Sequence, residues 1–189
     1  NTESGISPRA VPGLEDYIHV MATDEQDEEG ILISDEFTNP IKRRMMVEKR
    51  ARKMDDIFEY VQAPEVEGSE DADITLVGWG STYGVIHEAI EQLKAESINA
   101  NHLPIKWIVP FHTKQINEVL TNSKKVIIVE NNFSGQFYRY MRSETGMDVD
   151  AHIRKYDGEP FMPHQVVNGV KAIMAGDTEI FVPEQKIMV

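Results

Sequence analysis

The alternation of short apolar runs with helix-period segments between Ala72 and Val189 is the feature that most constrains the fold of this chain. Apolar, β-branched runs predict strands, and apolar residues spaced three and four apart predict helices. The predicted strands are Ile74–Val77, Ile105–Val109, Val126–Val129, His152–Tyr156 and Glu179–Val182. Strands separated by helices favour an α/β fold with an open, mainly parallel sheet and flanking helices. Val126–Val129 is the most apolar run and is therefore expected to be central.

The region from Asn1 to about Glu36 is rich in turns and acids, with nine Asp or Glu among the 22 residues from Glu15 to Glu36. Only Tyr17–Met21 resembles a strand. The scattered apolar residues bury too little surface to offset the entropy lost on ordering. We therefore expect this region to be loop, partly disordered, or packed on a part of the protein outside this sequence.

A helix is predicted from about Asn39 to Val61, because Asn39 or Thr38 can cap it and Pro40 suits its first turn. Seven Lys or Arg side chains fall within the twelve residues 42–53. They indicate either an anion or nucleic-acid patch, or a solvated helix that pairs with the preceding acids, and we favour the second interpretation. An acidic segment with Pro and Gly, 63–73, then indicates a linker.

Composition excludes several function classes. The 189 residues carry a net charge of −13, which opposes general binding to nucleic acid or anionic membranes. The chain has no cysteine, which excludes disulfides, a zinc ribbon, an iron–sulfur site and a cysteine nucleophile within it. The sequence begins without Met or a secretion signal. It reads as part of a longer protein that we expect to be cytoplasmic.

A glycine-rich turn follows the first predicted strand of the sheet, at Gly78–Gly84. Gly80, Ser81 and Thr82 are weak candidates for binding a phosphate, because N–H groups and hydroxyls at a helix start can hold an anion. The spacing matches neither the dinucleotide fingerprint nor a P-loop. The alternative, which we favour, is a tight turn in which Ser81 or Thr82 caps the next helix.

A second polar turn, Glu130–Gln136, follows the central strand. Its carboxamides and hydroxyl can bind an anion or fix a neighbouring loop, and its aromatic side chain can enter a partner surface. The candidates for subunit contacts are Arg9, Asn131, Asn132, Phe133, Ser134 and Gln136.

Catalytic and metal-binding motifs are absent from the sequence pattern. The six histidines show no HxxH or HxxxH spacing, so no metal ligand is predicted. No serine lies in a GxSxG context. We predict no catalytic side chain in this chain.

Six segments, in order and with sensible spacing, resemble the α subunit of 2-oxoacid:ferredoxin oxidoreductases (the 2-oxoglutarate and pyruvate oxidoreductase family). These segments are Ser4–Gly13, Asp27–Gly30, Arg44–Arg50 with Lys53, Val77–Thr82, Val129–Gln136 and Tyr156–Phe161. The resemblance covers nearly the whole chain. One departure is Asp24–Glu28, where the family often has His, so no metal or proton-transfer role is carried onto that segment.

The resemblance implies that the chain is the C-terminal part of that subunit. Residues 1–62 would be the tail of the thiamine-pyrophosphate pyrimidine-side domain plus a linker helix, and 72–189 a transketolase C-terminal-like domain. The family converts a 2-oxoacid, coenzyme A and oxidised ferredoxin into acyl-coenzyme A, CO2 and reduced ferredoxin. Thiamine pyrophosphate, Mg2+ and iron–sulfur clusters belong to the full complex, and none is expected to bind this chain alone.

Two function hypotheses remain open. In the first, the chain is an assembly and positioning module that contacts the β subunit or other subunits, while ferredoxin and coenzyme A are indirect partners. In the second, it is a stand-alone α/β module that binds a phosphorylated ligand such as coenzyme A or a nucleotide through the Gly80 turn. Nucleic acid and membranes are not expected partners.

Overall fold

The computed structural model describes residues 3–18, 25–27, 30, 32 and 39–184. The chain divides into two compact units, Asn1–Gln62 and Ala63–Val189, each of which is described by itself. Among the described residues, the helices are all too short or too polar to cross a lipid bilayer.

The first unit contains one long helix, α1 (Pro40–Tyr60). Asn39 Oδ1 accepts a hydrogen bond from the backbone N–H of Lys42 at 3.1 Å, and Pro40 stands at the first helical position. The predicted helix and its cap are therefore confirmed. Gly5 has a positive φ of 72° and approaches the backbone of Lys49 so closely that a Cβ atom would overlap it.

Ion pairs join α1 to the preceding acids. Glu25 accepts hydrogen bonds from Arg43, at 2.5 Å, and from Arg50. These two bonds lower the pKa of the Glu25 carboxyl group. Lys42 Nζ lies 3.7 Å from an Asp27 carboxylate oxygen. The interpretation of α1 as a helix paired with acidic residues is confirmed. In the predicted strand Tyr17–Met21, residues 17 and 18 form no regular structure, and the other three lie outside the described residues.

The second unit is built on a six-stranded sheet with the order β1-β3-β2-β4-β5-β6. Neighbouring strands are parallel except for β1, which pairs antiparallel with β3. The strands are β1 (Glu67–Gly68), β2 (Ile74–Trp79), β3 (Ala100–Ile105), β4 (Val126–Glu130), β5 (Ala151–Arg154) and β6 (Ile180–Phe181). The predicted open, mainly parallel α/β sheet is confirmed, and β4 lies inside it between β2 and β5.

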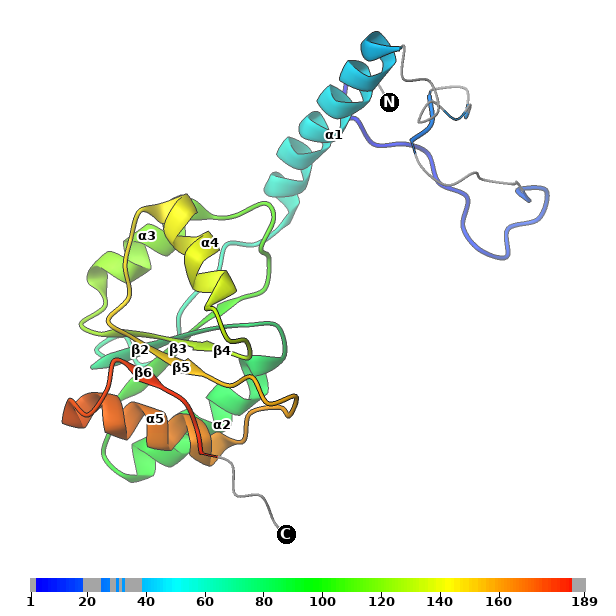
Figure 1. Ribbon diagram of the computed structural model, residues 1–189. Coiled ribbons are helices and arrows are strands. Elements are labelled where there is room, and N and C mark those ends of the chain that lie inside the picture. The colour runs from blue at the N-terminus through cyan, green and yellow to red at the C-terminus, as the bar shows by residue number, and fades with distance from the viewer. Residues whose placement is uncertain (1–2, 19–24, 28–29, 31, 33–38, 185–189) are drawn as a thin grey trace. The chain divides into compact units, whose positions relative to one another are not determined.

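Helices cover both faces of this sheet (Figure 1). Helices α2 (Tyr83–Ala95) and α5 (Pro163–Ala175) pack on one face, and α3 (Thr113–Asn122) and α4 (Gln136–Thr145) on the other. A short 3-10 helix, η1 (Gly80–Thr82), joins β2 to α2. Two apolar cores result, because the strands between the helix layers are buried on both sides.

The predicted strand Ile105–Val109 is wrong. The strand is β3, and it ends at the residue where the prediction begins. Its buried residues include Asn101, His102 and Pro104. Two polar side chains and a proline interrupt the apolar run that would predict a strand. Trp107 and Val109 are exposed instead. The predicted linker 63–73 also contains β1, so two of its residues, Glu67 and Gly68, belong to the sheet.

Candidate functional site

The carboxyl ends of β2, β4 and β5 lead into the loops that the sequence singled out. In open parallel sheets, ligands and partners bind at this edge, because the strands end there and helices begin there. The glycine turn follows β2, the polar turn Glu130–Gln136 follows β4, and the segment Tyr156–Phe161 follows β5.

The glycine turn is held by its own hydrogen bonds. Thr82 Oγ1 accepts from the backbone N–H of Trp79 at 3.0 Å and donates to the Trp79 carbonyl at 2.8 Å. Thr82 is buried and stands at the N-cap position of α2, but its side chain makes no bond to that helix. The predicted tight turn with Thr82 at the cap is therefore confirmed, although the Thr82 hydroxyl bonds to the Trp79 backbone and not to α2. Gly80 has a positive φ of 58°, which makes the sharp turn possible, and Ser81 is exposed.

A shallow cleft opens beside this turn. Its lining includes Trp79, Gly80, Tyr83, Pro104 and Lys106. Lys106 could attract an anion, but no carboxylate lines the cleft in the described part of the chain. Protein-bound Mg2+ is usually held through carboxylates, so these residues do not fit a Mg2+–diphosphate group. Iron–sulfur clusters do not fit either, because the chain has no cysteine.

Glu130 organises the polar turn from inside the protein. Its carboxylate is fully buried at the end of β4. It accepts hydrogen bonds from the backbone N–H groups of Phe137 at 2.9 Å and Tyr138 at 3.0 Å, and from Asn132 Nδ2 at 2.7 Å. A negative charge at a helix N-terminus is favourable, so Glu130 fixes the start of α4.

The predicted polar contact residues that follow β4 lie in one turn, and in the described part of the chain their side-chain hydrogen bonds stay within this turn or reach the loop after β5. Asn132 Oδ1 accepts from the backbone N–H of Gln136 at 3.1 Å. Asn131 Nδ2 donates to the Glu159 carbonyl at 3.4 Å, which joins the two loops. Ser134 is half-buried. Arg9 is exposed in the other unit, Asn1–Gln62.

Two aromatic side chains project from these loops. Phe133 is 71% exposed and Tyr156 is 50% exposed. Their ring centroids lie 5.0 Å apart with the planes nearly perpendicular. Lys155, which is buried, anchors the second loop by donating to Asp157 at 2.5 Å and to the Glu159 carbonyl at 3.1 Å. The exposed aromatic pair is therefore carried by loops that buried side chains hold in place.

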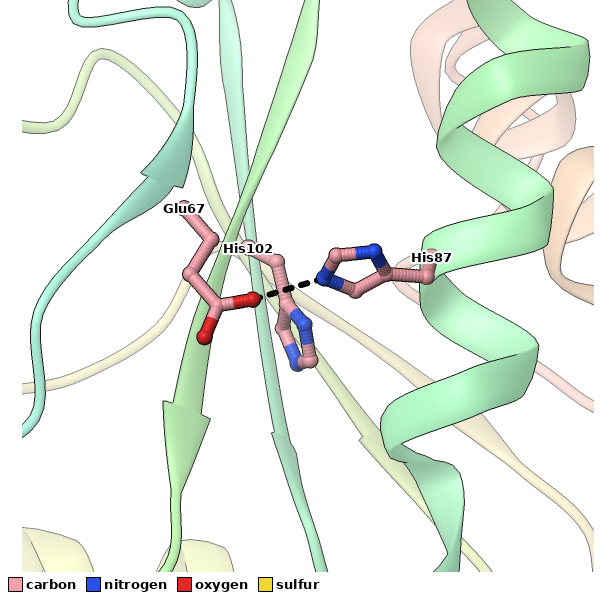
Figure 2. Close-up of side chains that lie close together, drawn as sticks. All are labelled: Glu67, His87 and His102. Carbon is pink, nitrogen blue, oxygen red and sulfur yellow. Dashed lines mark hydrogen bonds and ion pairs between the residues drawn. The ribbon is translucent and has the colours of Figure 1, made fainter.

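The structure also gathers a cluster that the sequence analysis missed. Glu67 of β1, His87 of α2 and His102 of β3 point toward one another (Figure 2). His87 Nε2 and Glu67 Oε2 lie 2.7 Å apart, and Glu67 Oε2 also accepts from the Tyr83 hydroxyl at 2.8 Å. Three separate elements contribute these side chains, so no local spacing could have revealed them. Carboxylate and imidazole groups are the kinds of ligand that hold metal ions.

Comparisons with known proteins agree with the motifs. Residues 72–177 match the family described as pyruvate:ferredoxin oxidoreductase core domain II. The α subunit of 2-oxoacid:ferredoxin oxidoreductase 2 from Aeropyrum pernix is 35% identical over 175 residues, which cover 91% of this chain and 26% of that protein. A 2-oxoglutarate oxidoreductase subunit, KorA, from Mycobacterium tuberculosis is 30% identical over 140 residues, covering 72% of this chain and 20% of its own length.

A solved structure is similar over most of the chain. The 2-oxoglutarate:ferredoxin oxidoreductase from Magnetococcus marinus, with 2-oxoglutarate, coenzyme A and succinyl-CoA bound, aligns with a TM-score of 0.66 and 33% identity. The alignment covers 89% of this chain and 29% of that one. The chain spans about a quarter of the length of the curated relatives that it matches, such as the Aeropyrum subunit.

Proposed function

The chain belongs to the core domain II family found in 2-oxoacid:ferredoxin oxidoreductase α subunits, and we propose that it is the assembly and positioning part of such a subunit. The whole protein would then convert a 2-oxoacid, coenzyme A and oxidised ferredoxin into acyl-coenzyme A, CO2 and reduced ferredoxin. The names of two relatives make 2-oxoglutarate the first substrate to test. Residues 1–62 would belong to the preceding thiamine-pyrophosphate domain of the same subunit.

The exposed aromatic pair carries this proposal. Phe133 and Tyr156 present a large apolar contact surface, and aromatic side chains are enriched at protein–protein interfaces. Buried Glu130 and Lys155 hold the loops beneath them, so little ordering entropy remains to be lost on docking. We therefore assign this surface to the β subunit of the same complex.

The chemistry would lie outside this chain. It has no cysteine to ligate an iron–sulfur cluster, and the described residues that line the cleft beside Gly80 include no carboxylate for Mg2+. Thiamine pyrophosphate, Mg2+ and the clusters would be held by other domains and by the β subunit. The role of this chain would be to hold those parts in place.

The test uses a full-length α subunit that contains this chain, co-expressed with its β partner. We expect 2-oxoglutarate-dependent or other 2-oxoacid-dependent reduction of a viologen dye, and no activity with any 2-oxoacid would defeat the proposal. The double variant Phe133→Ala/Tyr156→Ala should lower co-purification of β while α stays folded by circular dichroism. Met174→Ala is the matched control, because Met174 is an exposed apolar side chain on α5.

Binding of a phosphorylated ligand at the Gly80 turn is the alternative. Lys106 and the turn favour an anion there, but Thr82 already uses its hydroxyl within the turn. Calorimetry with coenzyme A and nucleotides separates the two proposals. Binding tighter than about 100 μM that Ser81→Ala abolishes would support the alternative.

A further inference from the structure

We propose that Glu67, His87 and His102 form a binding site for one divalent transition-metal ion, with Zn2+ as the best match, at the β1 edge of the sheet. One ligand atom from each of the three side chains lies within 4.8 Å of the other two. Two imidazole nitrogens and one carboxylate oxygen are a ligand set that Zn2+ adopts in proteins, with a fourth position left for water. The site is separate from the aromatic pair of the proposed function.

The sheet register places two of the ligands together. Glu67 and His102 are directly opposite each other in the antiparallel pairing of β1 with β3. Opposite residues in such a pair project from the same face with their Cβ atoms about 5 Å apart. His87 reaches them from α2, where Tyr83 lies one helical turn earlier and its ring stacks on His87 at 4.7 Å. Figure 2 shows the three side chains converging from these elements.

His102 gives the second, independent observation. It is fully buried, and neither ring nitrogen has a hydrogen-bond partner within the described part of the chain. Buried polar atoms are nearly always bonded, so an unpartnered buried imidazole calls for a ligand.

The other two ligands leave a path for the ion. His87 and Glu67 are partly exposed, so an ion can enter from solvent between α2 and β1. His87 Nε2 and Glu67 Oε2 lie 2.7 Å apart. A tetrahedral ion with ligand distances of about 2.0–2.2 Å requires them to separate to roughly 3.5 Å, which side-chain rotation can supply.

Lys106 opposes a cation at this site. Its Nζ lies 3.7 Å from Glu67 Oε1 and 5.6 Å from the centre of the Tyr83 ring. The side chain is largely exposed and can move into solvent when the ion binds. Nitrogen ligands also bind Mg2+ and Ca2+ poorly, since these ions prefer oxygen. The site should therefore select Zn2+ or Co2+, and removal of the Lys106 charge should tighten binding.

The ion would fasten β1 to the rest of the sheet. This strand has only two residues, Glu67 and Gly68, and lies at the edge of the sheet. A metal that joins β1, β3 and α2 would give the His102 ring the bonding partner that it lacks. Because metal binds the folded chain in preference to the unfolded one, it would also raise thermal stability.

The test is a titration of the 189-residue chain, first treated with a chelator, with Zn2+ and with Co2+. We expect one ion per chain by calorimetry, a Kd below about 10 μM, and the strong visible absorption that four-coordinate Co2+ acquires. The melting temperature should rise with Zn2+ and stay unchanged with Mg2+. Absence of saturable Zn2+ binding in this range would overturn the proposal.

Variants of the exposed ligands avoid the risk of unfolding the core. His87→Ala and Glu67→Gln should each weaken Zn2+ binding at least about tenfold, and Lys106→Met should tighten it. His164→Ala is the matched control, because His164 is an exposed histidine on α5 outside the cluster. If His87→Ala binds Zn2+ as tightly as the unaltered chain, or if His164→Ala loses as much affinity, the site is not the one proposed.

Discussion

Glu130 Oε2 accepts a hydrogen bond from the backbone N–H of Phe137 at 2.9 Å, and this bond joins the end of the central strand β4 to the first turn of α4. The carboxylate is fully buried, and its charge faces the positive end of the helix. The intervening loop, with exposed Phe133 at its tip, is therefore held at both ends. The hydrogen bonds to Glu130 thus hold the polar turn in place between β4 and α4.

Removing this carboxylate should destabilise the protein. Glu130→Ala leaves the N–H groups of Phe137 and Tyr138 without their acceptor in a buried place. We expect the free energy of unfolding to fall by about 2–4 kcal/mol, measured by urea denaturation. Glu144→Ala, an exposed change on the same helix, should cost less than about 0.5 kcal/mol. Equal effects of the two variants would contradict the capping role of Glu130.

Shortening a central core side chain should strongly lower the free energy of unfolding. Ile128 of β4 is fully buried and belongs to the core between the sheet and helices α3 and α4. Ile128→Ala should lower the free energy of unfolding by about 2–5 kcal/mol, because it removes apolar contacts and leaves a cavity. Val109→Ala, at an exposed position, serves as the control. A decrease in melting temperature of only a degree or two for Ile128→Ala would argue against this packing.

Two glycines close together in sequence should respond in opposite ways to alanine. A Cβ atom at Gly78 would overlap Ile86 Cδ1 and come within 2.8 Å of Thr82 Oγ1. Gly78→Ala should therefore destabilise the protein by about 1–3 kcal/mol. Gly84 lies in α2, and no described residue beyond its chain neighbours and the helix's own backbone has an atom within 4 Å of its Cβ position, so Gly84→Ala should stabilise by about 0.4–1 kcal/mol. Thermal melting of both variants checks the contrast, and destabilisation by Gly84→Ala would contradict it.

Stability should fall as the pH drops from about 6.5 toward 4. Burial, and then the charge of Arg154, lower the pKa of His152 to about 4, although the Glu130 and Asp148 carboxylates act in the opposite direction. The unfolded chain therefore binds a proton in this range before the folded chain does, and stability decreases with falling pH. The cost for one such histidine approaches about 3 kcal/mol near pH 4.

Urea denaturation at several pH values measures this dependence. His152→Gln removes the titrating group, so the loss of stability between pH 6.5 and 4 should be smaller in that variant than in the unaltered chain. Buried His102, with its pKa also lowered to about 4, continues to contribute in both proteins. Identical pH profiles for the two proteins would show that His152 is not protonated more readily in the unfolded state.

The sequence predicts the layered core well because its strongest patterns are local. The run Val126–Val129 is apolar at every position, which is typical of a strand whose two faces are both buried. The capped helix that begins at Pro40 is signalled by Asn39 and by the proline itself. The predicted strand Ile105–Val109 fails for a related reason, since β3 carries Asn101, His102 and Pro104 in buried positions. These residues of β3 are buried by neighbouring strands and helices, and the local sequence pattern does not report that burial.

By itself, therefore, the sequence determined the α/β class, the central strand, the long charged helix and the motifs that identify the family. Only the tertiary structure decided which side chains work together. Glu67, His87 and His102 meet because β1 pairs with β3 while α2 lies against that part of the sheet. Likewise, Phe133 meets Tyr156 because β4 and β5 are neighbours. Hydrophobic periodicity reports which face of an element is buried, but strand order and register bring distant polar groups together, and no local spacing encodes them.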